Sequence, residues 1–178
     1  MAEITWSQSP SGLADVAVRQ VRAEDLPGLE WEGEFVHFRR LYAEAYRRAL
    51  RGLSILWLAE QPGGPILGQV FVQLNCDRPE LCNGIDRAYL YAFRVRTAFR
   101  SLGIGALLLR TAEEDLIQRG YHFVTLNVGK DNLRAQAFYQ NHGFSVVASE
   151  PGRWSYVDHN GRIRDVVEPA WRMEKHLD

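Results

Sequence analysis

Cysteine is scarce in this sequence of 178 residues, which contains two, Cys76 and Cys82. Two cysteines are too few for a disulfide framework or a four-ligand zinc site, so no metal site is predicted, and we expect Cys82 to be a plain loop thiol. No apolar run approaches the roughly 20 residues that span a membrane. The first residues also lack the basic and apolar regions of a signal peptide. These absences predict a cytoplasmic protein.

An excess of charge of either sign is also missing. The sequence has 21 basic and 22 acidic residues, with a formal net charge of -1. We therefore expect no general attraction to nucleic acid or to an anionic membrane. Hydrophobic residues make up 46% of the chain and charged residues 24%, which is typical of a folded globular protein. The length fits a single domain, residues 1–178, with a loose lead-in over residues 1–14.

Apolar periodicity predicts a chain in which strands and helices are mixed. Apolar residues recur at threes and fours from Phe35 to Leu50 and again after Ile104, which predicts two helices. A third helix is expected to start at Asp131 or Asn132, both good N-caps, and to stop at Gly143. Strands are predicted at residues 16–21, 55–59, 69–74, 88–96, 121–128, 144–147 and 170–177, with a further hairpin at Asn160-Gly161. This order predicts one α+β domain.

A glycine-containing loop, Arg100 to Gly105, lies between a predicted strand and a predicted helix. Glycine lets the backbone approach a ligand closely, and the first amides of a helix have no intrahelical partner. Together with Arg100, these amides would form a site for phosphate or pyrophosphate. The alternative is that the two glycines only turn the strand into the helix. A P-loop does not match because Ala106 replaces its lysine, and a Rossmann loop does not match because Leu108 replaces its third glycine.

A second group of residues follows on the next predicted helix, where Ala135 and Tyr139 share one face. The two patterns are Arg100-x-x-Gly103-x-Gly105 and Asn132-x-x-Ala135-x-x-x-Tyr139, the latter followed by Gly143-Phe144. In this order and context, they resemble the two signatures of the GNAT superfamily of acyl-CoA-dependent N-acetyltransferases. The resemblance covers about residues 88–146 and depends on both halves, since either alone matches loosely.

The resemblance implies an α/β/α sandwich in which a mixed, mostly antiparallel sheet is flanked by helices and followed by an extra C-terminal hairpin. It implies acetyl-CoA as co-substrate, wedged where two strands part, and an amine as acceptor. The backbone of Phe93, Arg94 and Val95 would bind the pantetheine arm and the acetyl carbonyl, while Asn132 and Ala135 would lie beside that arm. The pyrophosphate would be held by Arg100 and by the amides of Ser101, Leu102, Gly103, Ile104, Gly105 and Ala106.

The resemblance also places Tyr139 near the thioester sulfur, where it is the candidate general acid. A tyrosine holds its proton at neutral pH and can donate it as thiolate charge develops. The alternative is a tyrosine that only packs in the core. The identity of the general base is left undecided, because Tyr91 stands where many relatives have a glutamate. Candidates for the base are Glu30, Glu32, Glu34, His37, His122, Asp158 and Glu168.

The acceptor side is less well marked. Glu30, Glu32 and Glu34 form an acidic stretch around Trp31 that would suit a cationic amine, although a solvated surface is the alternative. The aromatic residues of the C-terminal hairpin, Trp154 among them, either edge the acceptor site or close the sheet. The prediction is an N-acetyltransferase acting on a small-molecule amine, a protein N-terminus or a lysine. The alternative is a non-catalytic acyl-CoA-binding regulatory module. A homodimer is compatible with the sequence, which does not decide the oligomeric state.

Overall fold

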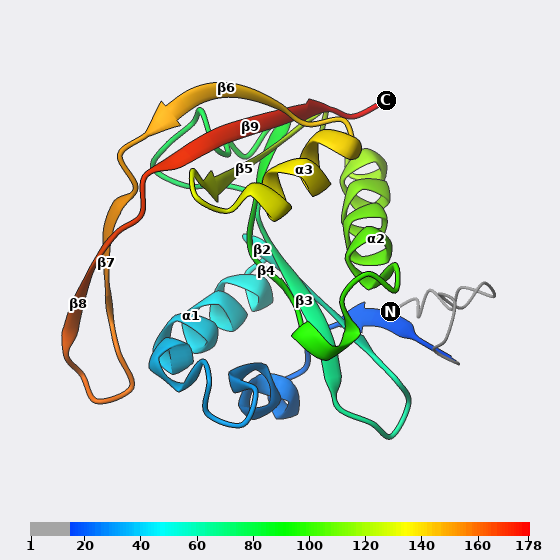
Figure 1. Ribbon diagram of the computed structural model, residues 1–178, viewed down its shortest axis with the longest axis vertical. Coiled ribbons are helices and arrows are strands. Elements are labelled where there is room, and N and C mark those ends of the chain that lie inside the picture. The colour runs from blue at the N-terminus through cyan, green and yellow to red at the C-terminus, as the bar shows by residue number, and fades with distance from the viewer. Residues whose placement is uncertain (1–14) are drawn as a thin grey trace.

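The computed structural model describes residues 15–178, and the predicted lead-in over residues 1–14 lies outside the described residues. Strands and helices follow one another in a mixed order (Figure 1). The helices are η1 (Ala23–Glu30), η2 (Val36–Phe38), α1 (Arg39–Leu50), η3 (Thr97–Phe99), α2 (Ile104–Gln118) and α3 (Leu133–Asn141). The strands are β1 (Ala17–Gln20), β2 (Ser54–Glu60), β3 (Ile66–Gln73), β4 (Arg87–Val95), β5 (Phe123–Gly129), β6 (Ser145–Glu150), β7 (Arg153–Val157), β8 (Ile163–Val167) and β9 (Ala170–His176).

Seven of these strands form one mixed sheet in the order β1-β2-β3-β4-β5-β9-β6. All neighbours are antiparallel except β4 and β5, which are parallel and are joined through α2, the crossover that a parallel pair requires. The strands β7 and β8 form a separate two-stranded hairpin. The predicted architecture, a mixed and mostly antiparallel sheet flanked by helices with an extra hairpin, is confirmed.

Helices cover both faces of the large sheet (Figure 1). On one face, the apolar stripe of α2, with Leu108 and Leu116, is buried in a cluster that reaches Met173 of β9 and against which α3 packs. On the other face, η1 and α1 bury Tyr42 against Phe71 of β3. Because both faces are covered, β2 and β3 are buried almost along their whole length. No helix within residues 15–178 is long and apolar enough to cross a membrane.

The two parallel strands part in the middle of the sheet. Their pairing ends at Leu90 and Leu126, although β4 continues to Val95 and β5 to Gly129. On its other side, β4 carries a bulge, because its register with β3 shifts between Gln69 and Phe71. Ala92 lies in this bulge with a φ of 48°. A bulge leaves backbone groups unpaired, so β4 can offer hydrogen bonds to a ligand where it leaves β5.

The loop between β3 and β4 corrects one expectation from the sequence. The prediction that Cys82 is a plain loop thiol is wrong, because it forms a disulfide with Cys76. The loop turns back on itself through a bridge between Asn75 and Asn83, and this brings the two Cα atoms to 5.7 Å. That separation lies within the range that a disulfide needs. A short cross-link of this kind does not require the many cysteines of a disulfide framework.

Candidate active site

The predicted phosphate loop connects β4 to α2 through η3. Gly103 is the N-cap of α2 and has a φ of 87°, a left-handed conformation that favours glycine. As a glycine, Gly103 has no side chain that could cap this helix, so the first amides keep free donors at the positive end of the dipole. Arg100 Nε donates to the Val95 carbonyl at 3.2 Å, and Arg134 of α3 reaches Ser101 Oγ at 3.5 Å. Free amides and two guanidinium groups therefore meet at this loop, which suits an anionic ligand.

A cavity of about 740 Å³ begins where β4 and β5 part. Five of the predicted site residues line it, namely Phe93, Arg94, Asn132, Ala135 and Tyr139. They come from the end of β4 and from the first two turns of α3, so the structure brings both sequence signatures to one space. Val95 and the loop from Arg100 to Ala106 do not line this cavity, although Arg100 contacts the end of β4.

The start of α3 shows how local sequence positions the site. Asn132 is the N-cap, as one of the two predicted alternatives had it, and its Oδ1 accepts a hydrogen bond from the Ala135 amide at 3.1 Å. The cap uses the side-chain oxygen and leaves the amide nitrogen for other contacts. Because the cap sets where α3 begins, it also sets which α3 residues face the cavity.

Tyr139 lies half-buried among aromatic rings. Its ring centroid is 6.1 Å from Phe93, 5.4 Å from Phe138 and 5.7 Å from Phe144. Burial raises the pKa of the Tyr139 hydroxyl above its usual value, and the neighbouring Tyr89 acts in the same direction. The hydroxyl therefore keeps its proton at neutral pH, which a general acid must do.

Two further tyrosines of β4 face the cavity, and sequence reasoning gave neither of them a role in binding. The Tyr89 and Tyr91 rings are 5.9 Å apart and nearly parallel, with an interplanar angle of 3°. Burial raises the pKa of both hydroxyls. The signal was present in the sequence, because residues two apart on a strand share a face. It was not decisive, because the pattern does not show which face borders a cavity.

The C-terminal hairpin forms one wall of this cavity. Trp154 of β7 lines it and stacks on Phe38, with ring centroids 6.4 Å apart, and Tyr156 lies 5.1 Å from the same ring. The sequence left open whether the hairpin edges the acceptor site or closes the sheet. It is not part of the large sheet, and Trp154 borders the cavity. Asp158 is used in the hairpin turn, where it accepts hydrogen bonds from the Asn160 and Arg162 amides.

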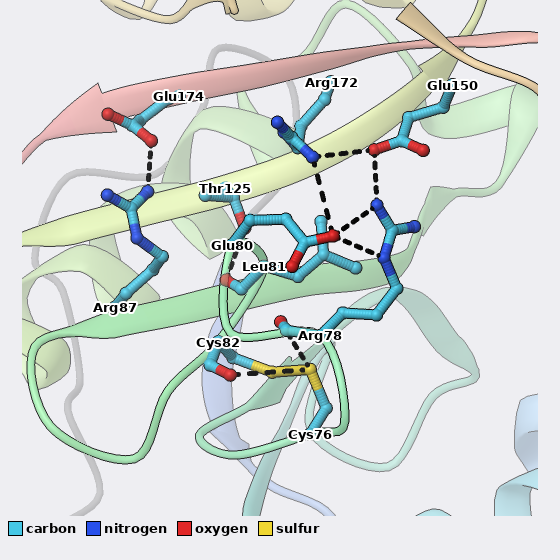
Figure 2. Close-up of polar contacts among 10 residues, drawn as sticks. All are labelled: Cys76, Arg78, Glu80, Leu81, Cys82, Arg87, Thr125, Glu150, Arg172 and Glu174. Atoms are coloured by element: carbon cyan, nitrogen blue, oxygen red, sulfur yellow. Dashed lines mark hydrogen bonds and ion pairs between the residues drawn. A yellow bond between two sulfur atoms is a disulfide. The ribbon is translucent and has the colours of Figure 1, made fainter. Parts of the chain in front are cut away.

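The loop closed by the disulfide, whose polar contacts are drawn in Figure 2, also borders the cavity. Arg78 and Leu81 of this loop line the cavity. Arg78 pairs with Glu150 at 2.7 Å, and Glu150 also pairs with Arg172 of β9 at 2.9 Å. Thr125 Oγ1 of β5 donates to the Leu81 carbonyl at 2.7 Å. These contacts attach the loop to the sheet at the cavity.

The predicted acidic stretch lies elsewhere. Glu30 pairs with Arg39 at 2.8 Å, Glu32 pairs with Arg96 at 2.6 Å, and Glu34 is exposed. None of these three glutamates lines the cavity, so their role in acceptor binding stays a prediction. Of the candidate general bases, Glu168 lines the cavity, and its side chain makes no ion pair within residues 15–178. In the same described range, no group of three or more His, Cys, Asp and Glu side chains could hold a metal ion.

Comparison with solved structures identifies the class to which this fold belongs. Ribosomal-protein-S18-alanine N-acetyltransferase from Escherichia coli is 19% identical, with a TM-score of 0.68 over 92% of this chain and 94% of that one. Naa20 from Chaetomium thermophilum, in complex with a bisubstrate analogue, is 27% identical, with a TM-score of 0.67 over 90% and 86%. A spermidine N-acetyltransferase chimera from Vibrio cholerae SpeG and hSSAT is 16% identical, with a TM-score of 0.68 over 91% and 95%. The fold is that of the N-acetyltransferases.

The family follows from the sequence itself. The model of the acetyltransferase (GNAT) family matches residues 21–144, and the chain belongs to this family. The match includes the predicted phosphate loop, Asn132 and Tyr139. A search among curated proteins gives no significant match. The family uses acetyl-CoA as acetyl donor and acetylates amines.

Proposed function

We propose that this protein is an enzyme that transfers an acetyl group from acetyl-CoA to a primary amine, on a small molecule or at a protein N-terminus or lysine. The observation that carries the proposal is the cavity between β4 and β5, onto which Tyr139 faces. The pyrophosphate would bind at the amides of the Ser101–Ala106 loop with Arg100, and the pantetheine arm along Phe93–Val95 beside Asn132 and Ala135. The enzyme is expected in the cytoplasm, and a homodimer stays a prediction.

In this mechanism, the neutral amine attacks the thioester carbonyl carbon directly. A bond forms from nitrogen to carbon, and the carbonyl oxygen becomes an oxyanion. Backbone amides freed by the bulge at Ala92 would donate to this oxygen. The carbon–sulfur bond then breaks, and the thiolate takes a proton from Tyr139, which regains one from solvent. Free CoA and the N-acetylated amine are the products.

The amine must also lose a proton during the reaction. Glu168 is the candidate that lines the cavity, and no arginine or lysine within residues 15–178 neutralises its charge. We therefore assign it the role of general base. Replacing Glu168 with Gln should lower kcat/KM by roughly tenfold to a hundredfold, with the loss becoming smaller as pH rises and more free amine is present. Asp165→Asn, an exposed carboxylate of β8, is the matched control, and equal rates for both variants would remove Glu168 from the mechanism.

The proposal is tested in two stages. Acetyl-CoA at about 100 times its Kd should stabilise the fold by about 2.7 kcal/mol, which is measurable as a rise in melting temperature. Release of CoA thiol in a screen of amines then reports turnover. A rise in melting temperature without turnover on any amine would favour the regulatory module, which the replacement of the strand glutamate by Tyr91 also favours. No rise at all would contradict both functions.

A further inference from the structure

The cavity carries more positive charge than its carboxylates neutralise, and under the proposed function this excess bears on the acceptor. The charged side chains that line it are Glu44, Arg48, Arg78, Arg94, Glu150, Arg153 and Glu168. The Glu44 carboxylate pairs with Arg47 and Arg51, which do not line the cavity. Glu150 is neutralised by Arg78 and Arg172. Glu168 is then the remaining carboxylate in the lining, compared with three remaining arginines, which are Arg48, Arg94 and Arg153.

The surroundings of Arg94 show how its positive charge is stabilised without a carboxylate. Its guanidinium lies 4.4 Å from the centroid of the Phe35 ring and 5.3 Å from that of Phe38. Arg94 Nη1 also donates to the Tyr42 hydroxyl at 3.0 Å. Stacking on aromatic rings stabilises a guanidinium without a carboxylate. Arg94 therefore has a packing role between β4 and α1.

The charge of Arg48 is not stabilised by comparable contacts. Its Nη2 donates to the Asn75 carbonyl at 2.8 Å, which fixes the side chain at the end of β3. Its Nε is buried and has no hydrogen-bond partner within residues 15–178. No carboxylate in that range pairs with it. Because a partly buried charge is costly without a counter-charge, Arg48 is suited to bind an anion that residues 15–178 do not supply.

Tyr91 is the second donor at this position. Arg48 of α1 and Tyr91 of β4 line the same cavity, and the positive charge of Arg48 lowers the Tyr91 pKa against the dominant, raising effect of burial. Burial keeps the Tyr91 hydroxyl protonated and able to donate. A guanidinium and a phenol that border one cavity form a suitable pair of donors for a carboxylate.

The acceptor must reach both Arg48 and the reacting centre near Tyr139. Tyr139, Tyr89 and Tyr91 all line the cavity, and the Tyr91 ring is 5.9 Å from the Tyr89 ring. Arg48 of α1 lines the same cavity, so an anion bound by Arg48 and Tyr91 would share it with the candidate acid. We propose that the acceptor is an amine that also carries a carboxylate, which Arg48 and Tyr91 bind while the nitrogen reacts near Tyr139.

This proposal rests on the proposed acetyl transfer and adds the acceptor class to it. It differs from the cationic amine predicted from Glu30, Glu32 and Glu34. Such a carboxylate can belong to a free amino acid whose reacting amine is remote from it, or to an acidic side chain near a peptide N-terminus. The chemistry at Arg48 is the same for both, and the experiment separates them.

The test compares matched acceptors in the full-length enzyme by CoA release. The free-molecule arm uses 5-aminopentanoate, 5-aminopentanamide and pentylamine. The peptide arm uses Ala-Glu-Ala-Ala amide and Ala-Gln-Ala-Ala amide. A charge-assisted hydrogen bond should raise kcat/KM for the carboxylate at least about tenfold over its amide. The arm with the larger preference identifies the source. Equal rates in both arms, or a preference for pentylamine, would overturn the proposal while leaving acetyl transfer intact.

Variants of α1 assign the preference to one side chain. Arg48→Met should reduce the ratio of carboxylate to amide to about one and leave the acetyl-CoA shift in melting temperature unchanged. Arg40→Met removes the same charge from an exposed residue of α1 that does not line the cavity, and should keep the ratio. If Arg48→Met does not fold, Arg48→Lys keeps the charge and loses the fork geometry, and its ratio should fall by a smaller factor. An unchanged ratio in the folded Arg48 variant would refute the role of this residue.

Discussion

At the scale of single residues, burial determines what a hydroxyl can do at this site. The Tyr139 ring contacts Phe93 and Phe144, so replacing it with Phe keeps the packing and removes only the hydroxyl. If the hydroxyl protonates the thiolate, Tyr139→Phe should lower kcat by roughly a hundredfold. The affinity for acetyl-CoA should change little, because no contact of the ring is lost. Steady-state kinetics with the best acceptor of the amine screen, together with the acetyl-CoA melting shift, measure both quantities.

The control for this variant is Tyr156→Phe, which removes a hydroxyl from the hairpin at a residue that does not line the cavity. It should keep both kcat and the melting shift. A Tyr139→Phe enzyme with the turnover of the control would show that Tyr139 only packs, as the alternative from the sequence has it.

Some residues of the site can be recognised from the local sequence, and others only from the packing of the fold. The cap at Asn132 and the turn at Gly103 are local features, and their residue types reveal them before any contact is known. Arg48 and Glu168 reach the same cavity from distant segments. Their place depends on how α1 and the hairpin pack on the sheet, which no short pattern records. The sequence therefore makes more definite predictions for the cofactor side of the site than for the acceptor side.

At the scale of elements, the start of α2 depends on the left-handed conformation of Gly103. A valine at this position would be strained at a φ of 87°, at a cost of about 1–2 kcal/mol. The strain would move the amides that we assign to the pyrophosphate. Gly103→Val should therefore lower the melting temperature and weaken acetyl-CoA binding by about tenfold or more. Isothermal titration calorimetry measures the second effect.

Gly105 is the matched control on the same turn. A Cβ added there would meet Phe138 at 3.5 Å, which is an ordinary contact, and the backbone conformation suits any residue. Gly105→Ala keeps the amide that we assign to the pyrophosphate, so it should keep stability and lose less affinity than Gly103→Val. If Gly103→Val bound acetyl-CoA as tightly as Gly105→Ala, the assignment of the loop to the pyrophosphate would be wrong.

The loop between β3 and β4 is the second element whose constraint can be tested. A disulfide between Cys76 and Cys82 restricts the unfolded chain, and for so short a loop the loss on reduction is about 2 kcal/mol. Reduction should therefore lower the urea midpoint of the native protein. The Cys76→Ser/Cys82→Ser double variant should have the lower midpoint with or without reductant. Identical midpoints for the oxidised and reduced wild type would contradict the estimate.

At the scale of the whole molecule, local pattern and global topology are separate problems. The strands and helices follow from apolar periodicity and caps, as in α2, whose stripe repeats every four residues. That β9 inserts between β5 and β6 does not follow, because the register from Phe123 to His176 joins distant segments. The hairpin turn was visible at Asn160-Gly161. Its docking on Phe38 depends on rings that are far apart in sequence.

Acid sensitivity is also a property of the whole fold, and two carboxylates from distant segments of the chain, Asp25 and Asp158, contribute to it. The amides of Arg162 and Asn160 and the guanidinium of Arg164 lower the pKa of Asp158 to about 2. Burial alone would raise the pKa of Asp25, but the hydrogen bonds and charges of Arg19 and Arg22 together outweigh it and lower the pKa. An unfolded chain binds protons at these groups near pH 4. It therefore takes up more protons than the native state between about pH 4 and pH 2.

The free energy of unfolding should consequently be nearly constant above about pH 5 and fall as the pH decreases from 4 to 2. Asp158→Asn removes one of the two groups and should make that fall less steep, while its stability near pH 7 is lower because the hairpin turn loses a charged acceptor. Asp165→Asn, also on the hairpin, removes the same charge without these contacts and should keep the wild-type slope. Urea unfolding at several pH values measures the slopes. Equal slopes in Asp158→Asn and the wild type would mean that the hairpin is already open before the fold unfolds, so that its turn contributes no linkage.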